Sequence, residues 1–209
     1  MDINSWYMFT ILSFLTIISP GPAILLAINN GLMENMKDVV ISSSANILGL
    51  FCLSSISILG LGAILQASSM LFLIMKIMGA SYLIYMGIKQ FRNFENVFDS
   101  HTNIKIEKNS WEVFRKGFLV SVTNPKPIIF FTAIFPVFLN PASSLIPQFF
   151  IMTFTFMFLS FSSLMSFAHF AKSFKFWFSS GKRARIFNRV SGSIFVMLGF
   201  GLLRVKSKV

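Results

Sequence analysis

Two short stretches decide the fold: Ser19-Pro20-Gly21-Pro22 near the N-terminus and Thr123-Asn124-Pro125-Lys126-Pro127 in the second half of the chain. Each places two prolines one residue apart inside a long apolar run. A proline lacks an amide hydrogen, and its ring displaces the carbonyl one turn earlier in a helix. We therefore predict that a helix breaks in each stretch and that a new half-helix starts near Ala23 and near Ile128.

The composition around these stretches indicates a membrane protein. Of the 209 residues, 55% are hydrophobic and only 12% are charged, whereas a soluble domain is roughly 25% charged. Crossing a bilayer core of about 30 Å takes about 20 helical residues. Six apolar runs are long enough, so we predict an all-α integral membrane protein with transmembrane helices over Trp6–Asn30, Val39–Gln66, Ser68–Phe91, Phe114–Leu139, Leu145–Ala171 and Phe187–Leu203.

The positive residues predict the orientation. The three connections after the first, third and fifth runs carry 13 Lys and Arg, against three in the C-terminal tail and none in the other connections. Cytoplasmic loops are enriched in such residues, so we predict those connections to be cytoplasmic and both termini to be outside. The net charge of +11 follows from this pattern, which argues against nucleic acid as a partner.

A polar segment divides the runs into two groups of three. We predict a first three-helix repeat at 1–92, a polar cytoplasmic loop at 93–113 and a second three-helix repeat at 114–209. Because three is odd, the repeats cross the membrane in opposite senses, as in inverted-repeat transporters. The pattern is compatible with a 3+3 inverted repeat.

The two predicted breaks lie at similar depth. Pro22 is eight residues from the cytoplasmic end of its run at Asn30, and Pro125 is eleven residues from the start of its run at Phe114. These spacings correspond to about 12 and 16 Å, close to the middle of the bilayer. Interrupted helices at matching positions of two halves are the best sequence indicator of a transporter's binding site; the alternative is a pair of kinks that only shape the helices.

The chemistry at the breaks suits an amino acid. The new half-helices present free amides and positive dipole ends, which stabilise a carboxylate, and Lys126 adds a full charge. The Asn124 side chain and the freed carbonyls accept hydrogen bonds from an ammonium group. A charge at mid-bilayer is functional or paired, or else it extends to the interface; both readings stay open for Lys126 and for Lys76.

Other polar residues leave the energy coupling open. No acidic residue lies inside a predicted span, and His169 is either a titrating group or an interfacial histidine. Tyr82 lines a cavity or belongs to an aromatic belt. Gly192, Gly199 and Gly201 are expected to allow close helix contacts. With Cys52 alone and two distant histidines, we predict no metal site, no cofactor and no enzyme activity.

The chain resembles the LysE/RhtB family of bacterial amino-acid exporters. The matching pieces, in the family's order and spacing, are Ser19-Pro20-Gly21-Pro22, the stretch from Lys76 to Gly87, Asn124-Pro125-Lys126 with Phe130, Phe131 and Phe135-Pro136, and the run from Gly192 to Leu203. The resemblance implies a six-helix inverted repeat in the bacterial inner membrane that exports amino acids or derivatives in exchange for protons.

The resemblance also implies site residues. By position, Pro20, Gly21, Pro22, Asn124, Pro125 and Lys126 belong to the substrate site, with Lys76 and Tyr82 nearby. The chain departs from the family at Ala23, where many members have Asp or Asn, and at Ser160, where some have an acidic residue. Both departures concern the coupling ion and the choice of substrate.

Two other functions remain as alternatives. A channel for small solutes would also use paired helix breaks. A membrane enzyme or redox carrier is disfavoured because Cys52 has no second cysteine to pair with. The expected partners are a small-molecule substrate and the lipid bilayer, and a homodimer is compatible with the sequence.

Overall fold

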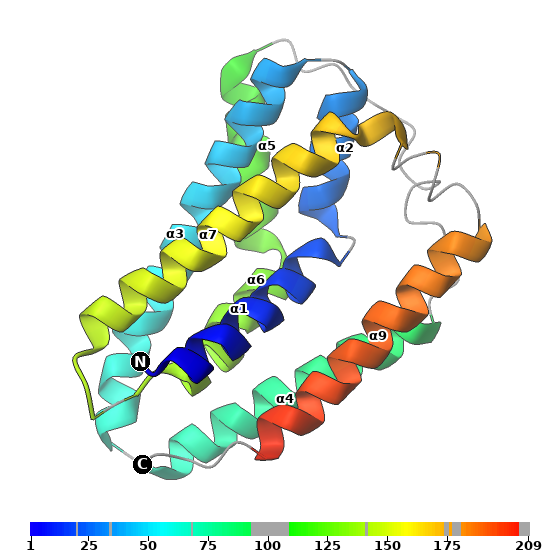
Figure 1. The fold of residues 1–209 in the computed structure, drawn as a ribbon. Helices are drawn as coiled ribbons and strands as arrows, with labels where there is room; N and C mark the ends of the chain where they lie inside the picture. The colour runs from blue at the N-terminus through cyan, green and yellow to red at the C-terminus, as the bar shows by residue number, and fades with distance from the viewer. Residues whose placement is uncertain are drawn as a thin grey trace.

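The structure is a computed structural model that describes residues 1–19, 21–33, 35–67, 69–92, 109–140, 142–173, 176 and 181–204. The regular elements of these ranges are all helices (Figure 1). They are α1 (Ile3–Ile18), α2 (Pro22–Leu32), α3 (Met36–Ala67), α4 (Ser69–Arg92), α5 (Ser110–Thr123), α6 (Pro125–Ile129), the π-helix η1 (Phe130–Ile134), the 3-10 helix η2 (Phe135–Phe138), α7 (Leu145–His169) and α9 (Gly181–Arg204).

Helices cover all six predicted apolar runs, and most extend beyond them. α9, for example, begins at Gly181, six residues before the predicted start at Phe187. Its first turns hold Lys182, Arg183 and Arg185, so they are helical without being apolar. Hydrophobicity predicts which part of a helix avoids water and does not predict where the helix ends.

Both predicted helix breaks are confirmed. α1 and α2 meet at an angle of 57°, and α5 meets the helical run Pro125–Phe138 at 47°. The second half-helix starts at Pro125, so the prediction of a start near Ile128 was wrong. Asn124 caps this helix by accepting a hydrogen bond from the Lys126 amide at 3.1 Å, and Pro125 occupies the first helical position, where no amide donor is required.

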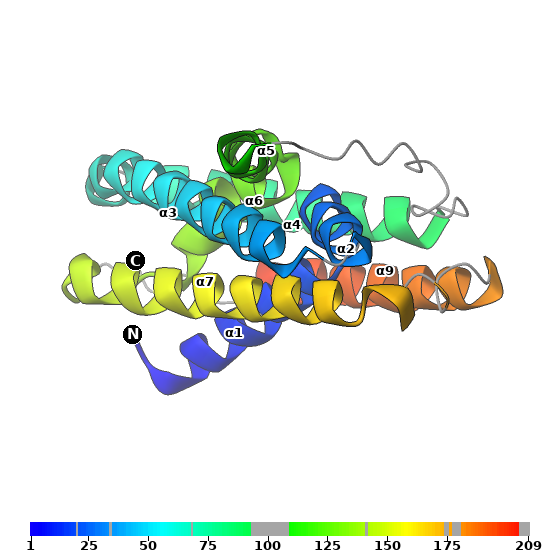
Figure 2. The same cartoon turned by 90° about the horizontal axis from the view of Figure 1, so that it is seen from above.

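Helices from the two predicted repeats pack against each other. α3 lies against α5 and α7, α2 and α1 lie against α7, and α4 lies against α9. Figure 1 shows the α4–α9 pair on one side of α1 and α6, with α3, α5 and α7 on the other, and Figure 2 shows α3 and α2 between α5 and α7. Small residues permit close approach. A Cβ atom on Gly192 would lie 2.5 Å from the Gly87 carbonyl oxygen, and one on Gly199 would lie 2.6 Å from Ile84, whereas Gly201 faces open space.

The helix ends segregate to two ends of the molecule. The start of α1, the start of α7 and the end of α9 lie at one end, and the α2–α3 connection, the end of α4 and the start of α9 lie at the other (Figure 1). The second end carries basic residues such as Lys37, Arg92 and Arg183. We call it the basic end.

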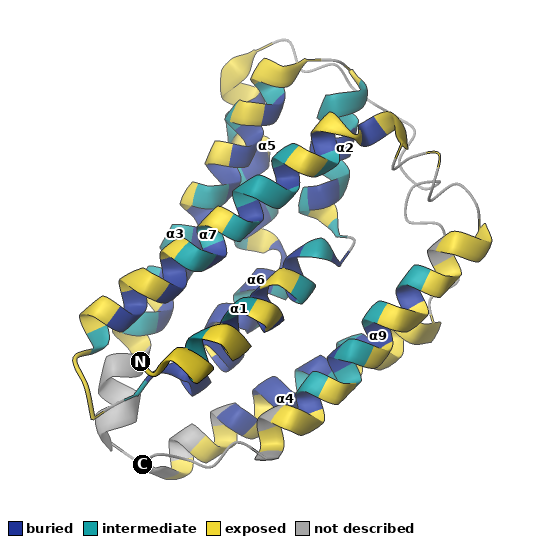
Figure 3. Cartoon of the chain, in the orientation of Figure 1, coloured by how far each residue is buried: buried dark blue, intermediate teal, exposed yellow. Residues whose placement is uncertain are grey.

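The outer surface is apolar, as expected for contact with lipid. Phe158, Met197 and Ile146 are 72%, 72% and 68% exposed, and the outward faces of α1, α7 and α9 are broadly exposed in Figure 3. Among the described residues, Met36–Gly60 of α3 and Leu145–His169 of α7 are long and apolar enough to cross a membrane, and the two bent pairs bring the candidate spans to four. The protein is therefore an all-helical membrane protein.

Candidate functional site

The two helix breaks meet through Lys126. Its Nζ donates a hydrogen bond to the Ser19 carbonyl oxygen at 2.6 Å, across 107 residues of sequence. Ser19 is the residue that ends α1, so its carbonyl is one of those that a helix end leaves without an amide partner. The Lys126 ammonium thus links the break between α1 and α2 to the break between α5 and α6.

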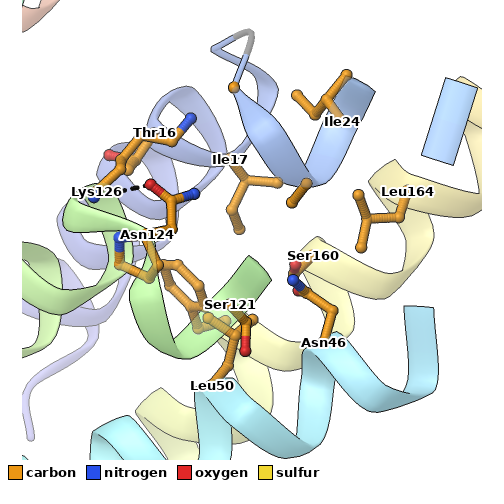
Figure 4. A pocket seen from close by; sticks show the side chains of 14 residues that line it. Thr16, Ile17, Ile24, Asn46, Leu50, Ser121, Asn124, Lys126, Ser160 and Leu164 are labelled. Carbon is orange, nitrogen blue, oxygen red and sulfur yellow. Dashed lines mark hydrogen bonds between the residues drawn. The ribbon is translucent and has the colours of Figure 1, made fainter. Parts of the chain in front are cut away.

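Two cavities adjoin this link. The small cavity, of about 50 Å³, lies among α1, α2, α3 and α7, and its wall includes Thr16, Ile24, Asn46, Ser121, Ser160 and Leu164 (Figure 4). The wide cavity, of about 460 Å³, lies between the breaks and the α4–α9 pair, and its wall includes Ser19, Pro22, Tyr82, Lys89, Gln90 and Asn188. Gly21, Asn124 and Lys126 line both cavities.

The wide cavity extends toward the basic end. Its wall takes Lys89 and Gln90 from the last turn and a half of α4 and Asn188 from the first half of α9. Gln90 also fastens α4 to the first break, since its Oε1 accepts a hydrogen bond from the Ser19 hydroxyl at 3.0 Å. A solute that enters from the basic end therefore meets polar groups before it reaches Lys126.

Phenylalanines pack tightly on the side of the break away from the basic end. The rings of Phe9 and Phe130 lie 5.9 Å apart, and those of Phe131 and Phe156 lie 4.9 Å apart. Phe9, Phe130 and Phe131 are at most 1% exposed. Ser57 holds this region in place by donating a hydrogen bond to the Phe131 carbonyl of the π-helix. The cluster closes the site on that side.

Opposite helix ends face each other at the first break. α1 ends there with carbonyls that have no intrahelical donor, and α2 begins there with the amides of Ala23 and Ile24, whose positions in the first turn leave them without an intrahelical acceptor. Ala23 and Ile24 both line the small cavity. The break therefore offers hydrogen-bond acceptors and donors within one site, together with the positive charge of Lys126.

The structure brings together six of the eight residues predicted for the substrate site. Those that line a cavity are Gly21, Pro22, Tyr82, Asn124, Pro125 and Lys126. Lys76 is 8% exposed in α4 and lines neither cavity. Pro20 lies outside the described residues.

Several cavity residues were not predicted. Asn46, Gln90 and Asn188 are amides within or beside apolar runs, and Asn46 and Asn188 are 5% and 6% exposed. Because a buried amide in a membrane helix is costly without a partner, amides within apolar runs could have indicated a polar site.

The histidine considered as a titrating group lies away from the site. His169, at the end of α7, packs its ring against Phe170 at 4.8 Å and lines neither cavity.

Comparison with known proteins identifies one family. The family model described as "LysE type translocator" matches residues 14–206. The chain is 28% identical over 199 residues to a homoserine/homoserine lactone efflux protein of Salmonella typhimurium, a match that covers 95% of this chain and 96% of that protein. It is 26% identical over 197 residues to a leucine efflux protein of Enterobacter, covering 93% and 92%. No solved structure matches the chain.

Proposed function

Because the chain belongs to the LysE type translocator family, we propose that it is a secondary transporter that exports amino acids or their derivatives across the bacterial inner membrane in exchange for protons. The observation that carries this proposal is the hydrogen bond of 2.6 Å between Lys126 Nζ and the Ser19 carbonyl, at the meeting point of two helix breaks and two cavities. The efflux proteins named above support the direction and the substrate class.

The break suits both charged groups of an amino acid. The carboxylate takes the Lys126 ammonium and the free amides at the start of α2, where the helix dipole also favours an anion. The substrate ammonium takes the free carbonyls at the end of α1, the negative end of that helix. A molecule with only one of the two groups leaves the other set of backbone groups unsatisfied.

Part of the packing supports an inverted repeat of six spans. In such a repeat, α1 corresponds to α5, α2 to η1, α3 to α7 and α4 to α9. The contact of α3 with α5 then corresponds to that of α7 with α1, and the contact of α2 with α7 to that of η1 with α3. The α4–α9 and α3–α7 contacts correspond to themselves. All of these contacts are present. With the basic end in the cytoplasm, both termini lie outside and the wide cavity opens inward.

Export then follows from alternating access. The substrate enters the wide cavity from the cytoplasm and displaces Ser19 from Lys126, and the phenylalanine cluster opens in turn. Four titratable side chains line the cavities, namely Tyr82, Tyr85, Lys89 and Lys126. Lys126 is the one among them that reaches both cavities, so we assign binding of the substrate's carboxylate to it.

The test is an export assay in cells that lack their own amino-acid exporters. Cells that express the protein are loaded with dipeptides, and the amino acids that appear outside are followed with time. We expect faster efflux of at least one amino acid, against its gradient, and slower efflux when a protonophore collapses the proton gradient. Efflux no faster than in cells without the protein would refute the proposal, and efflux that only runs downhill would indicate a channel.

A further inference from the structure

Two buried polar side chains, those of Asn46 and Ser160, face the small cavity. Asn46 on α3 is 5% exposed and Ser160 on α7 is 6% exposed. Both side chains point toward the space between α1, α3 and α7 (Figure 4). Within the described part of the chain, neither makes a hydrogen bond.

The two other hydroxyls of this wall are satisfied within their own helices. The Thr16 hydroxyl donates to the Leu12 carbonyl at 2.8 Å, and the Ser121 hydroxyl donates to the Phe118 carbonyl at 3.1 Å. Membrane-buried polar groups without a partner are costly, and Asn46 alone holds two donors and an acceptor. The pair is therefore poised for a group that enters the cavity.

The cavity limits what that group can be. The rest of the wall is apolar, with Ile17, Ile24, Leu50, Phe156 and Leu164. Lys126, at the edge that adjoins the breaks, is the one charged residue among those that line it. A second charge would therefore be buried without a counter-charge.

The volume sets the size of the group. A cavity of about 50 Å³ holds about three to five water-sized groups if each needs about 10–15 Å³. That number matches a side chain of about three to five non-hydrogen atoms. The backbone of the amino acid would stay at the breaks, where Gly21, Asn124 and Lys126 border both cavities.

We infer that the small cavity is the side-chain pocket of the transporter, in which Asn46 and Ser160 select short, uncharged side chains that carry a hydroxyl or amide group. This inference rests on the proposed function and deepens it, because it assigns the substrate's side chain to a place and names the residues that recognise it. Asn46 binds the polar group through its carboxamide, and Ser160 provides a second donor or acceptor from the opposite wall.

The test compares substrates of equal shape. Purified protein in proteoliposomes is assayed for uptake of radiolabelled homoserine and norvaline, and of threonine and valine; each pair differs by a hydroxyl in place of a methyl group. We expect the wild-type protein to prefer the hydroxylated member by about tenfold or more, since leaving one buried polar group unsatisfied costs that much. The Asn46→Leu variant should lose most of this preference and keep transport of the apolar member.

Controls separate specificity from folding. Ser160→Ala should lower the preference in part, and Asn46→Ser should restore part of it relative to Asn46→Leu. Ser166→Ala removes an exposed hydroxyl from α7, the helix that carries Ser160. This hydroxyl donates a hydrogen bond to the Ser162 carbonyl in its own turn, so the variant should leave the preference unchanged. If Asn46→Leu does not fold, Ser160→Ala and Asn46→Ser decide the matter.

The outcomes distinguish the two claims. Transport that shows the wild-type preference in both Asn46→Ser and Ser160→Ala, or a wild-type protein that favours norvaline and valine, overturns the side-chain pocket and leaves the exporter proposal standing. Wild-type protein that moves no amino acid at all overturns both.

Discussion

Replacement of Gly192 by alanine should disturb the site although this residue touches neither cavity. The added Cβ would lie 2.5 Å from the Gly87 carbonyl oxygen and 2.7 Å from the Phe91 amide nitrogen, both backbone atoms of α4. The first distance is about 0.9 Å shorter than the 3.4 Å at which ordinary Cβ contacts begin. α4 and α9 must therefore move apart, because backbone atoms cannot turn aside as a side chain does.

This displacement has two measurable effects. Overpacking of this kind costs about 1–3 kcal/mol, so the midpoint of thermal unfolding in detergent should fall by several degrees. α4 also carries Gln90, and a shift of up to about 0.9 Å would disturb its hydrogen bond of 3.0 Å with Ser19. The rate of export per molecule in the membrane should fall accordingly.

Gly201→Ala is the matched control. It makes the same change on the same helix, with the same gain in helix propensity of about 1 kcal/mol, at a position where a Cβ meets nothing within 4 Å. Both variants are expressed, quantified in membranes and compared for unfolding midpoint and export. If Gly192→Ala matches Gly201→Ala in both measurements, the close packing of α4 on α9 described above is refuted.

Two other predictions concern the break and the orientation. A Cβ at Gly21 would lie 3.3 Å from Lys126 Nζ, so Gly21→Ala should lower export without loss of membrane insertion, and Gly21→Val should lower it further; export by Gly21→Val equal to that of wild type would contradict the crowding of Lys126. The orientation is tested with single-cysteine variants in a Cys52→Ser background. A membrane-impermeant thiol reagent added to spheroplasts should label Ser143→Cys and not Asn35→Cys, since these exposed positions lie on connections at opposite ends of the bundle. The reverse labelling would show that the proposed topology is inverted.

The parts of the fold that the sequence predicts are those with a local cause. A proline breaks a helix through its own ring and missing amide, so Pro22 and Pro125 mark the bends of 57° and 47° without reference to the rest of the chain. The apolar runs likewise predict which stretches of the chain are helical. The start of the second half-helix was misplaced because Asn124 acts as a cap, which depends on how its side chain turns toward the Lys126 amide.

The site is only partly predictable because it depends on how each helix is rotated. Lys126 and Lys76 both interrupt apolar runs, yet only Lys126 lines the cavities, and the packing of α4 against α9 and η1 sets the direction of Lys76. The partner of Lys126 is the backbone carbonyl of Ser19. Every residue has such a carbonyl, so the residue types do not identify this partner. Asn46 and Ser160 lie more than 100 positions apart in the sequence, and only tertiary structure shows that they share a wall.

The central claim is that the substrate's carboxylate binds the Lys126 ammonium at the meeting point of the two breaks. Binding of the transported amino acid to detergent-purified Lys126→Met protein tests this most directly, with Lys37→Met as a control that removes an exposed positive charge at the basic end. A hydrogen bond between charged groups contributes about 1.5–3 kcal/mol, so the Kd of Lys126→Met should rise by about tenfold to 100-fold while that of Lys37→Met stays at the wild-type value. A folded Lys126→Met protein that binds the amino acid with wild-type affinity would contradict the claim.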